Sequence, residues 1–275
     1  MVGVPTAIAI LAFEPPHGAT ALLALLLLAA AAAGFREPTP LWYIERGWAV
    51  LLAGGFAVST ALAPTRPILD RSLLTVAIAG ATVAAMGAVR PELLVGLDWQ
   101  VADQFERTLA RYDFGWLGGP PAEAAVRQFA ALWQALYPAM LVLASVSALA
   151  VTVYLLGRVR GEESALPPLG RFRFSEHLVW VLAAGLVLVA LPVGAWADRA
   201  GGNIVTVMGG LYVLRGTAVL VWLGASVISS GWIIAAWTLA ALVLYPVTMG
   251  ATLVVGVSDT WLDLRSRLGV AGNKE

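Results

Sequence analysis

Long apolar runs with few charged residues are the feature that most limits what this chain can fold into. A helix needs about 20 mostly apolar residues to cross the ~30 Å of hydrocarbon in a bilayer. Apolar residues make up 60% of the 275 residues and charged residues 12%, about half the share in a soluble domain. Seven segments meet or approach the requirement: 19–34, 47–63, 73–89, 129–156, 177–196, 204–229 and 232–257. The sequence therefore predicts an all-α polytopic transmembrane helical bundle of about seven spans, with a range of six to eight.

The spacing of these runs predicts one integral membrane domain over residues 1–275. Its parts are N-terminal spans at 19–89, an amphipathic linker at 90–127, a four-span core at 129–257 and a tail at 258–275. The apolar run at 2–13 is short and is stopped by Glu14, Pro15 and Pro16. It is either an interfacial piece or a tilted partial span.

The linker contains apolar residues spaced as on one face of a helix. They recur at intervals of three and four, while charged residues take the remaining positions. The apolar set is Trp99, Ala102, Phe105, Leu109 and Tyr112. This pattern predicts an in-plane amphipathic helix, and a helix packed against the end of the bundle explains it equally well. Pro120 and Pro121 break the chain and suit the start of a helix. We expect this helix to run over residues 122–156, with a kink at Pro138.

Arg215 is the sharpest polar signal, because it lies near the middle of the run at 204–229. An arginine there costs about 2.5–3.5 kcal/mol on insertion scales unless it faces protein or water. If the last two spans meet near Gly231, Tyr245 and Thr248 are at its level, and Asp259 lies about 18 Å further along, too far for a direct pair. The pattern favours a polar or anionic ligand pocket at Arg215, Tyr245 and Thr248. A structural explanation is that Arg215 bonds helix backbone or Tyr245.

Asn203 and Asp259 fall at matching levels by the same arithmetic, near one membrane face. They are therefore candidate ligand-binding residues. The alternative is a set of helix caps and tail ion pairs, with Asn203 as the N-cap of the sixth span and Asp259 or Asp263 paired with Arg265 or Arg267.

The last two apolar runs contain several small residues, which reduce the side-chain bulk between the two predicted helices. They include Gly209, Gly216, Gly250 and Gly256. Such residues allow two helices to approach closely. They also leave room for a ligand, and we favour close packing.

Several functions are disfavoured by what the sequence lacks. Acidic and basic residues balance at 17 each, so no net field suggests nucleic acid as a partner. Cysteine is absent, and no hydrolase, zinc or phosphate-binding motif is present. We expect no catalysis, no metal and no cofactor.

Four ordered stretches resemble the YybS-like family of multipass bacterial membrane proteins, a domain of unknown function. The likeness runs from about Pro138 to Arg267, and Arg215 stands where the family usually carries Gln. The stretches are Tyr137-Pro-Ala-Met-Leu141, Arg171-Phe-Arg-Phe174 leading to Trp180, Asn203 with Leu211-Tyr-Val-Leu-Arg-Gly216, and Gly256-Val-Ser-Asp-Thr-Trp-Leu-Asp-Leu-Arg265. The resemblance implies distant similarity to the substrate-capturing S-components of energy-coupling-factor transporters and to the rod-shape protein MreD.

Together these features predict a multipass protein of the bacterial inner membrane, in contact with the lipid bilayer. The first functional hypothesis is a transporter-like small-molecule-binding subunit that works with a membrane protein partner or an ATPase module. The alternative is a non-catalytic scaffold or interaction protein related to the cell envelope or morphogenesis.

Overall fold

Every regular element in the described part of the chain is a helix. The computed structural model describes residues 40–62, 66–109, 120–160, 169–227, 239 and 243–271. The predicted segments at 2–13 and 19–34, residue Tyr112, and residues 232–238 and 240–242 of the predicted segment at 232–257 lie outside these ranges. The chain divides into two compact units, an N-terminal unit of residues 1–166 and a C-terminal unit of residues 167–275.

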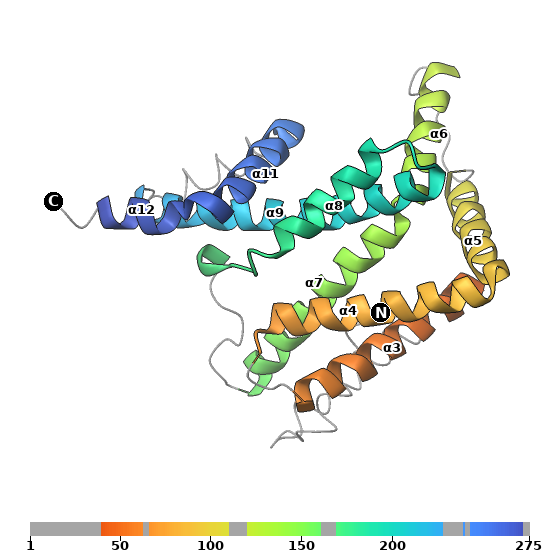
Figure 1. Ribbon diagram of the computed structural model, residues 1–275, viewed down its shortest axis with the longest axis horizontal. Coiled ribbons are helices and arrows are strands. Elements are labelled where there is room, and N and C mark those ends of the chain that lie inside the picture. The colour runs from red at the N-terminus through yellow and green to blue at the C-terminus, as the bar shows by residue number, and fades with distance from the viewer. Residues whose placement is uncertain are drawn as a thin grey trace. The chain divides into compact units, whose positions relative to one another are not determined.

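The helices of the N-terminal unit are α3 (Pro40–Leu62), α4 (Ile68–Val89), α5 (Pro91–Leu109), α6 (Pro120–Ala135) and α7 (Tyr137–Arg160). Those of the C-terminal unit are the short 3-10 helix η2 (Leu169–Arg171), α8 (Leu178–Ala190), α9 (Ala195–Val227), α11 (Tyr245–Leu262) and α12 (Leu264–Ala271) (Figure 1).

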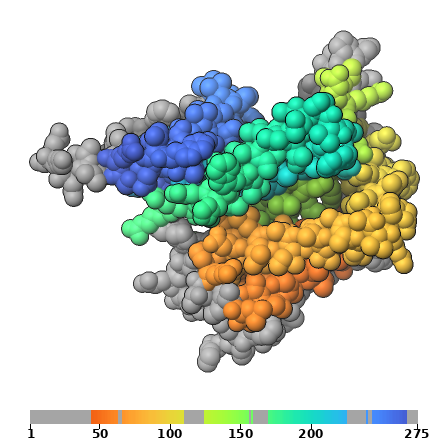
Figure 2. Space-filling model, in the orientation of Figure 1, coloured from red at the N-terminus to blue at the C-terminus, as the bar shows by residue number. Residues whose placement is uncertain are grey.

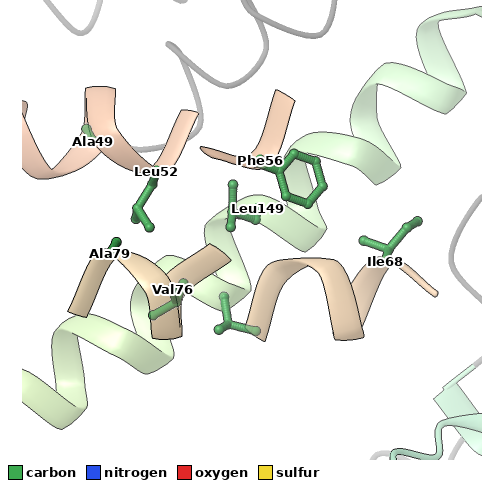
Figure 3. Close-up of a cluster of buried hydrophobic side chains, with 8 residues drawn as sticks. Ala49, Leu52, Phe56, Ile68, Val76, Ala79 and Leu149 are labelled. Atoms are coloured by element: carbon green, nitrogen blue, oxygen red, sulfur yellow. The ribbon is translucent and has the colours of Figure 1, made fainter. Parts of the chain in front are cut away.

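An apolar cluster joins α3, α4 and α7. Leu52 and Phe56 of α3, Val76 of α4 and Leu149 of α7 are buried, and their side chains point toward one another (Figure 3). The indole nitrogen of Trp48 donates a hydrogen bond of 3.0 Å to the Ser145 hydroxyl, which ties α3 to α7. Because lipid tails are as apolar as these side chains, the cluster stabilises the unit mainly through close packing.

The chain turns sharply from α4 into α5, the helix expected in the linker (Figure 1). Pro91 begins α5 because a proline cannot continue the hydrogen bonding of α4. Val101 is the buried residue of α5, whereas Trp99 of the predicted apolar face is 64% exposed. The packed side of α5 is therefore turned away from Trp99.

The helix expected across residues 122–156 is divided in two. Pro120 begins α6, two residues before the expected start, and a turn at Leu136 separates α6 from α7. Pro138 lies in the first turn of α7, where its missing N–H removes no essential bond. The predicted kink is thus a break two residues before the proline.

The predicted fifth span ends early. It was expected to run from 177 to 196, but α8 stops at Ala190. Leu191 is extended, as a residue before proline prefers, and Gly194 has a positive φ of 124° that L side chains rarely adopt. Trp196 therefore belongs to α9, and α8, with 13 residues, is about 20 Å long.

The central element of the C-terminal unit is α9, which packs against both α8 and α11. Glycines make both contacts close. A Cβ atom on Gly201 would lie 2.8 Å from the carbonyl oxygen of Gly185 in α8, and a Cβ atom on Gly216 would overlap the carbonyl oxygen of Thr252 in α11. Gly209 and Gly250 face open space. Close packing, the favoured explanation of the glycines, is confirmed at Gly216 and Gly256.

Three described helices are long and apolar enough to cross a membrane: Ile68–Val89, Tyr137–Leu155 and Ala195–Gly224. Leu178–Ala190 is apolar but shorter. The described residues thus support a helical membrane protein, and the count of seven spans stays a prediction.

Candidate functional site

A buried carboxylate with two arginine partners forms the polar centre of the C-terminal unit. Oδ2 of Asp259 accepts a hydrogen bond of 2.9 Å from Nε of Arg215 and one of 3.0 Å from Nη2 of Arg265. Nη2 of Arg215 also donates to the backbone oxygen of Asp259, at 3.2 Å. The three side chains are between 0 and 6% exposed. We call this group the Arg–Asp–Arg cluster.

The pairing of Arg215 with Asp259 corrects the expectation that the two lie about 18 Å apart. That expectation placed the meeting point of the last two spans near Gly231. In the structure, Gly216 of α9 lies against Gly256 of α11. Residues at equal depth in the two helices are therefore symmetric in sequence about a position midway between these glycines, which lies on the C-terminal side of Gly231. Arg215 and Asp259, which neighbour this contact in sequence, therefore come together.

A break in the helix brings Arg265 back to Asp259. Asp263 ends α11 in the left-handed conformation, with φ 41° and ψ 58°, and α12 begins at the next residue. In a continuous helix, Arg265 would be about 9 Å further along the axis than Asp259 and on another face. The reversal at Asp263 produces the pair, which confirms the expected partnership of Asp259 with Arg265.

Arg265 also fixes the segment that precedes α8. Its Nη1 donates to the carbonyl oxygen of Gly170 at 2.8 Å, and its Nη2 donates to that of Phe172 at 3.0 Å. We call residues 169–174 the strap. Backbone carbonyls outside long helices need hydrogen-bond partners of this kind, so Arg265 holds the strap against the start of α12.

Two buried aromatic rings lie beside Arg215 of the cluster. The guanidinium carbon of Arg215 lies 5.3 Å from the centre of the Phe174 ring, and Phe174 makes an edge-to-face contact of 5.1 Å with Tyr212. Both rings are buried. Cation–π contacts of this kind are strengthened where water is excluded.

Phe174, Tyr212 and the second arginine were not predicted as site residues. Tyr212 precedes Arg215 by three positions, a spacing that places both on one face of a helix, so this signal was present in the sequence. The strap offered no such signal, because it lies 41 residues before Arg215 at its nearest end.

The charges of the cluster do not balance. Two guanidinium groups share one carboxylate, which leaves one positive charge in a buried site. At the cluster and the adjoining Tyr212, four buried polar atoms have no hydrogen-bond partner among the described residues: Nη1 of Arg215, Nε of Arg265, the Tyr212 hydroxyl and Oδ1 of Asp259. Buried polar groups are nearly always paired, so these atoms identify a place where a polar group is expected.

The other predicted ligand residues lie apart from this cluster. Tyr245 is 58% exposed at the start of α11, and Thr248 donates its hydroxyl to the carbonyls of Leu244 and Tyr245. Thr248 is 11 residues from Asp259, about 16 Å along α11. The structure therefore does not bring Tyr245 and Thr248 to Arg215.

Asn203 likewise remains apart from Asp259. It lies inside α9, which begins at Ala195, so it is not the N-cap of that helix. Its amide nitrogen donates to the carbonyl of Arg199, one turn earlier. The expected proximity of Asn203 and Asp259 rested on the same assumed meeting point near Gly231, and it fails for that reason.

An exposed ion pair lies next to the buried cluster in sequence. Nη2 of Arg173 in the strap is 2.7 Å from Oδ1 of Asp263, and both side chains are 48% exposed. A hydrogen bond from Ser266 and attraction to Arg173 and Arg265 lower the pKa of Asp263. No group of three or more metal-ligating side chains occurs among the residues that the structure describes.

More than half of the chain matches a known family of membrane proteins. A family model described as "Predicted membrane protein (DUF2232)" matches residues 113–260. The chain belongs to the DUF2232 family. The matched range includes Phe174, Tyr212, Arg215 and Asp259 and ends before Arg265. Searches of curated proteins and of solved structures find no match. Membership establishes a predicted membrane protein and leaves its ligand and partners to be inferred from the site.

Proposed function

We propose that this DUF2232 protein is a non-catalytic binding protein of the bacterial inner membrane, and that it captures a small anionic ligand at the Arg–Asp–Arg cluster. The observation that carries the proposal is the unbalanced positive charge of the cluster together with its buried donors that have no partner among the described residues. Arg215 and Arg265 would bind the ligand, Tyr212 would donate a further hydrogen bond, and Asp259 would orient the two guanidinium groups.

Electrostatics supports an anion as the ligand. Isolated charge is strongly disfavoured in a medium of low dielectric constant, and an ionisable group within a membrane protein is by default a functional candidate. Arginine presents several donors in a fixed plane that suits carboxylate and phosphate groups. An anion would remove the excess charge and satisfy the free donors at once.

A transporter-like role agrees with the resemblance of this chain to the YybS-like family and to S-components. Capture by such a subunit requires a binding group inside the membrane and a segment that opens. Movement of the strap would serve the second requirement, because its carbonyls accept hydrogen bonds from Arg265 that a ligand would use. Transport would require a further membrane protein or an ATPase module.

The alternative is a scaffold, which was expected to recruit partners through small-residue faces and the in-plane helix. Gly216 and Gly256 are already used inside the C-terminal unit. This favours the binding protein, and the scaffold remains the competing outcome of the experiment below. A buried water would also satisfy the free atoms of the cluster, and the same experiment separates it from a ligand.

Native mass spectrometry of the detergent-solubilised protein tests the proposal. Wild type is compared with Arg215→Gln and with Tyr212→Phe, which removes only a hydroxyl that has no partner among the described residues. Tyr245→Phe is the matched control, because it removes an exposed hydroxyl from the same unit. We expect a retained small anion in wild type and in the control, and its loss in both site variants.

The other outcomes are equally informative. Loss of the small anion only in Tyr245→Phe would show that the ligand binds at Tyr245 and Thr248 and not at the Arg–Asp–Arg cluster. A bare chain in every sample would contradict the binding function and leave water in the cluster. A co-purified protein without a small molecule would favour the scaffold.

A further inference from the structure

A second site of different chemistry lies in the N-terminal unit, at the turn between α4 and α5. A groove with a volume of about 520 Å³ is lined by Thr82, Ala85, Met86, Val89, Arg90 and Leu93. This volume is within the range of about 300–1,000 Å³ for small-molecule sites. We propose that the groove binds an anionic phospholipid, with Arg90 on the headgroup phosphate and an acyl chain along α4.

The direction of the groove fits an acyl chain. Residues 82, 85, 86 and 89 are spaced by three or four, so they form one stripe along α4. The stripe is about 10 Å long. Because α4 is long and apolar enough to cross the membrane, the stripe runs in the direction of the lipid tails. Leu93 of α5 closes its end.

The depth of Arg90 fits a headgroup. It directly follows Val89, the last residue of the candidate span, and it is the C-cap of α4. A residue at this position lies at the level of the lipid phosphates. An arginine binds phosphate through two parallel hydrogen bonds, and basic sites between membrane helices on the cytoplasmic side suit anionic headgroups.

Within the described ranges the Arg90 side chain makes no ion pair or hydrogen bond, and it is exposed. Glu92 is the acidic residue closest in sequence, and it is not part of the groove lining. The only charge in the lining is therefore positive. The tail-facing residues are also accessible, since Met86 is 55% exposed and Leu93 46%. Figure 2 shows α4 and α5 at the surface on the face viewed.

The proposal is tested by native mass spectrometry of delipidated protein titrated with phosphatidylglycerol. Phosphatidylcholine and inorganic phosphate are titrated separately, so that a charged headgroup, a lipid tail and a free anion are distinguished. We expect wild type to retain phosphatidylglycerol in preference to both. Arg90→Gln should weaken this binding about fivefold, the effect of one basic residue near an anionic surface.

Two further variants make the test specific. Ala85→Trp fills the groove and leaves Arg90 intact, so it should also weaken phosphatidylglycerol binding, and it decides the case if Arg90→Gln fails to fold. Arg158→Gln is the control, because Arg158 is exposed and also follows a candidate span but does not line the groove.

Three results would overturn the proposal. They are equal retention of phosphatidylcholine, an equal loss of phosphatidylglycerol in Arg158→Gln, and unchanged binding in both Arg90→Gln and Ala85→Trp. None of these results bears on the Arg–Asp–Arg cluster, since that cluster is tested by variants in the C-terminal unit.

Discussion

In the N-terminal unit the most deeply buried large side chains include Leu52, Phe56 and Leu149, whereas in the C-terminal unit they include Tyr212 and Asp259. One unit is held by interlocking apolar groups, and the other by charged hydrogen bonds and close backbone contact at glycines. In a bilayer, apolar groups gain little by leaving lipid, so packing defects are partly filled by lipid or neighbouring side chains. A charged cluster has no such replacement. We therefore expect the C-terminal unit to tolerate substitution less.

The largest effect is expected from Asp259→Asn, because it leaves two buried guanidinium groups without a carboxylate. Removing one member of a buried ion pair costs about 3–5 kcal/mol. The free energy of unfolding in detergent, measured by denaturant titration, should fall by this amount, while Asp263→Asn should have little effect. Equal losses in the two variants would contradict the central position of Asp259.

Replacing all three members of the cluster by apolar residues sharpens this prediction. Such replacements of buried ion pairs are often neutral or stabilising, so Arg215→Met, Asp259→Leu and Arg265→Met together should recover part of the stability lost in Asp259→Asn. The recovery should be incomplete, because Arg265→Met also removes the donors to the carbonyls of Gly170 and Phe172. The triple variant should still lack the small anion in native mass spectrometry. Recovery of stability with a retained anion would place the ligand elsewhere.

In the N-terminal unit, Leu149→Ala should lower the free energy of unfolding by about 2–5 kcal/mol, the range for large-to-small changes in a packed core. Leu149 is fully buried, and lipid or neighbouring groups are expected to place its effect at the lower end. Val151→Ala, on the same helix but 54% exposed, is the control. A loss in Leu149→Ala larger than that in Asp259→Asn would reverse the comparison of the units.

Gly256→Ala should cost about 1–3 kcal/mol by forcing α9 and α11 apart, since a Cβ atom there would overlap the carbonyl oxygen of Tyr212. Gly250→Ala, on the same helix but facing open space, should be neutral or slightly stabilising. Thermal unfolding midpoints of the two variants check the difference. Equal midpoints would show that the helices separate without cost.

The smallest effect is expected at the exposed pair of Arg173 and Asp263. Because the pKa of Asp263 is lowered in the folded protein, its contribution to stability is present at neutral pH and is lost as the pH falls through that lowered pKa. The thermal midpoint of Asp263→Asn should be slightly below that of wild type at neutral pH and equal to it in acid. A difference that persists in acid would point to the Asp263 turn rather than its charge.

The apolar runs and helix-start residues were predictable because their signals are local. Helical segments were predicted where α4, α5 and α7 lie, and the start of α6 was placed two residues late, at 122 instead of Pro120. The end of α8 was also placed too late, since Pro192 and Gly194 interrupt a run that is apolar throughout. Hydropathy measures composition and does not register a turn made of apolar residues.

The candidate site was predictable only in part. Arg215 and Asp259 were selected individually, and the pair of Asp259 with Arg265 was expected as a structural explanation. Their union was missed because the helix register was estimated from the lengths of the apolar runs. Register depends on where two surfaces fit most closely, and here the contact of Gly216 with Gly256 decides it.

The sequence by itself determined that this is a helical membrane protein with an arginine inside an apolar helix, because hydropathy and the cost of burying charge depend on residue type alone. Only the tertiary structure decided which groups satisfy that arginine. Asp259, Arg265 and the strap are distant along the chain, and their meeting depends on glycine contacts and a left-handed residue at Asp263. These act through shape, which residue type and spacing do not specify.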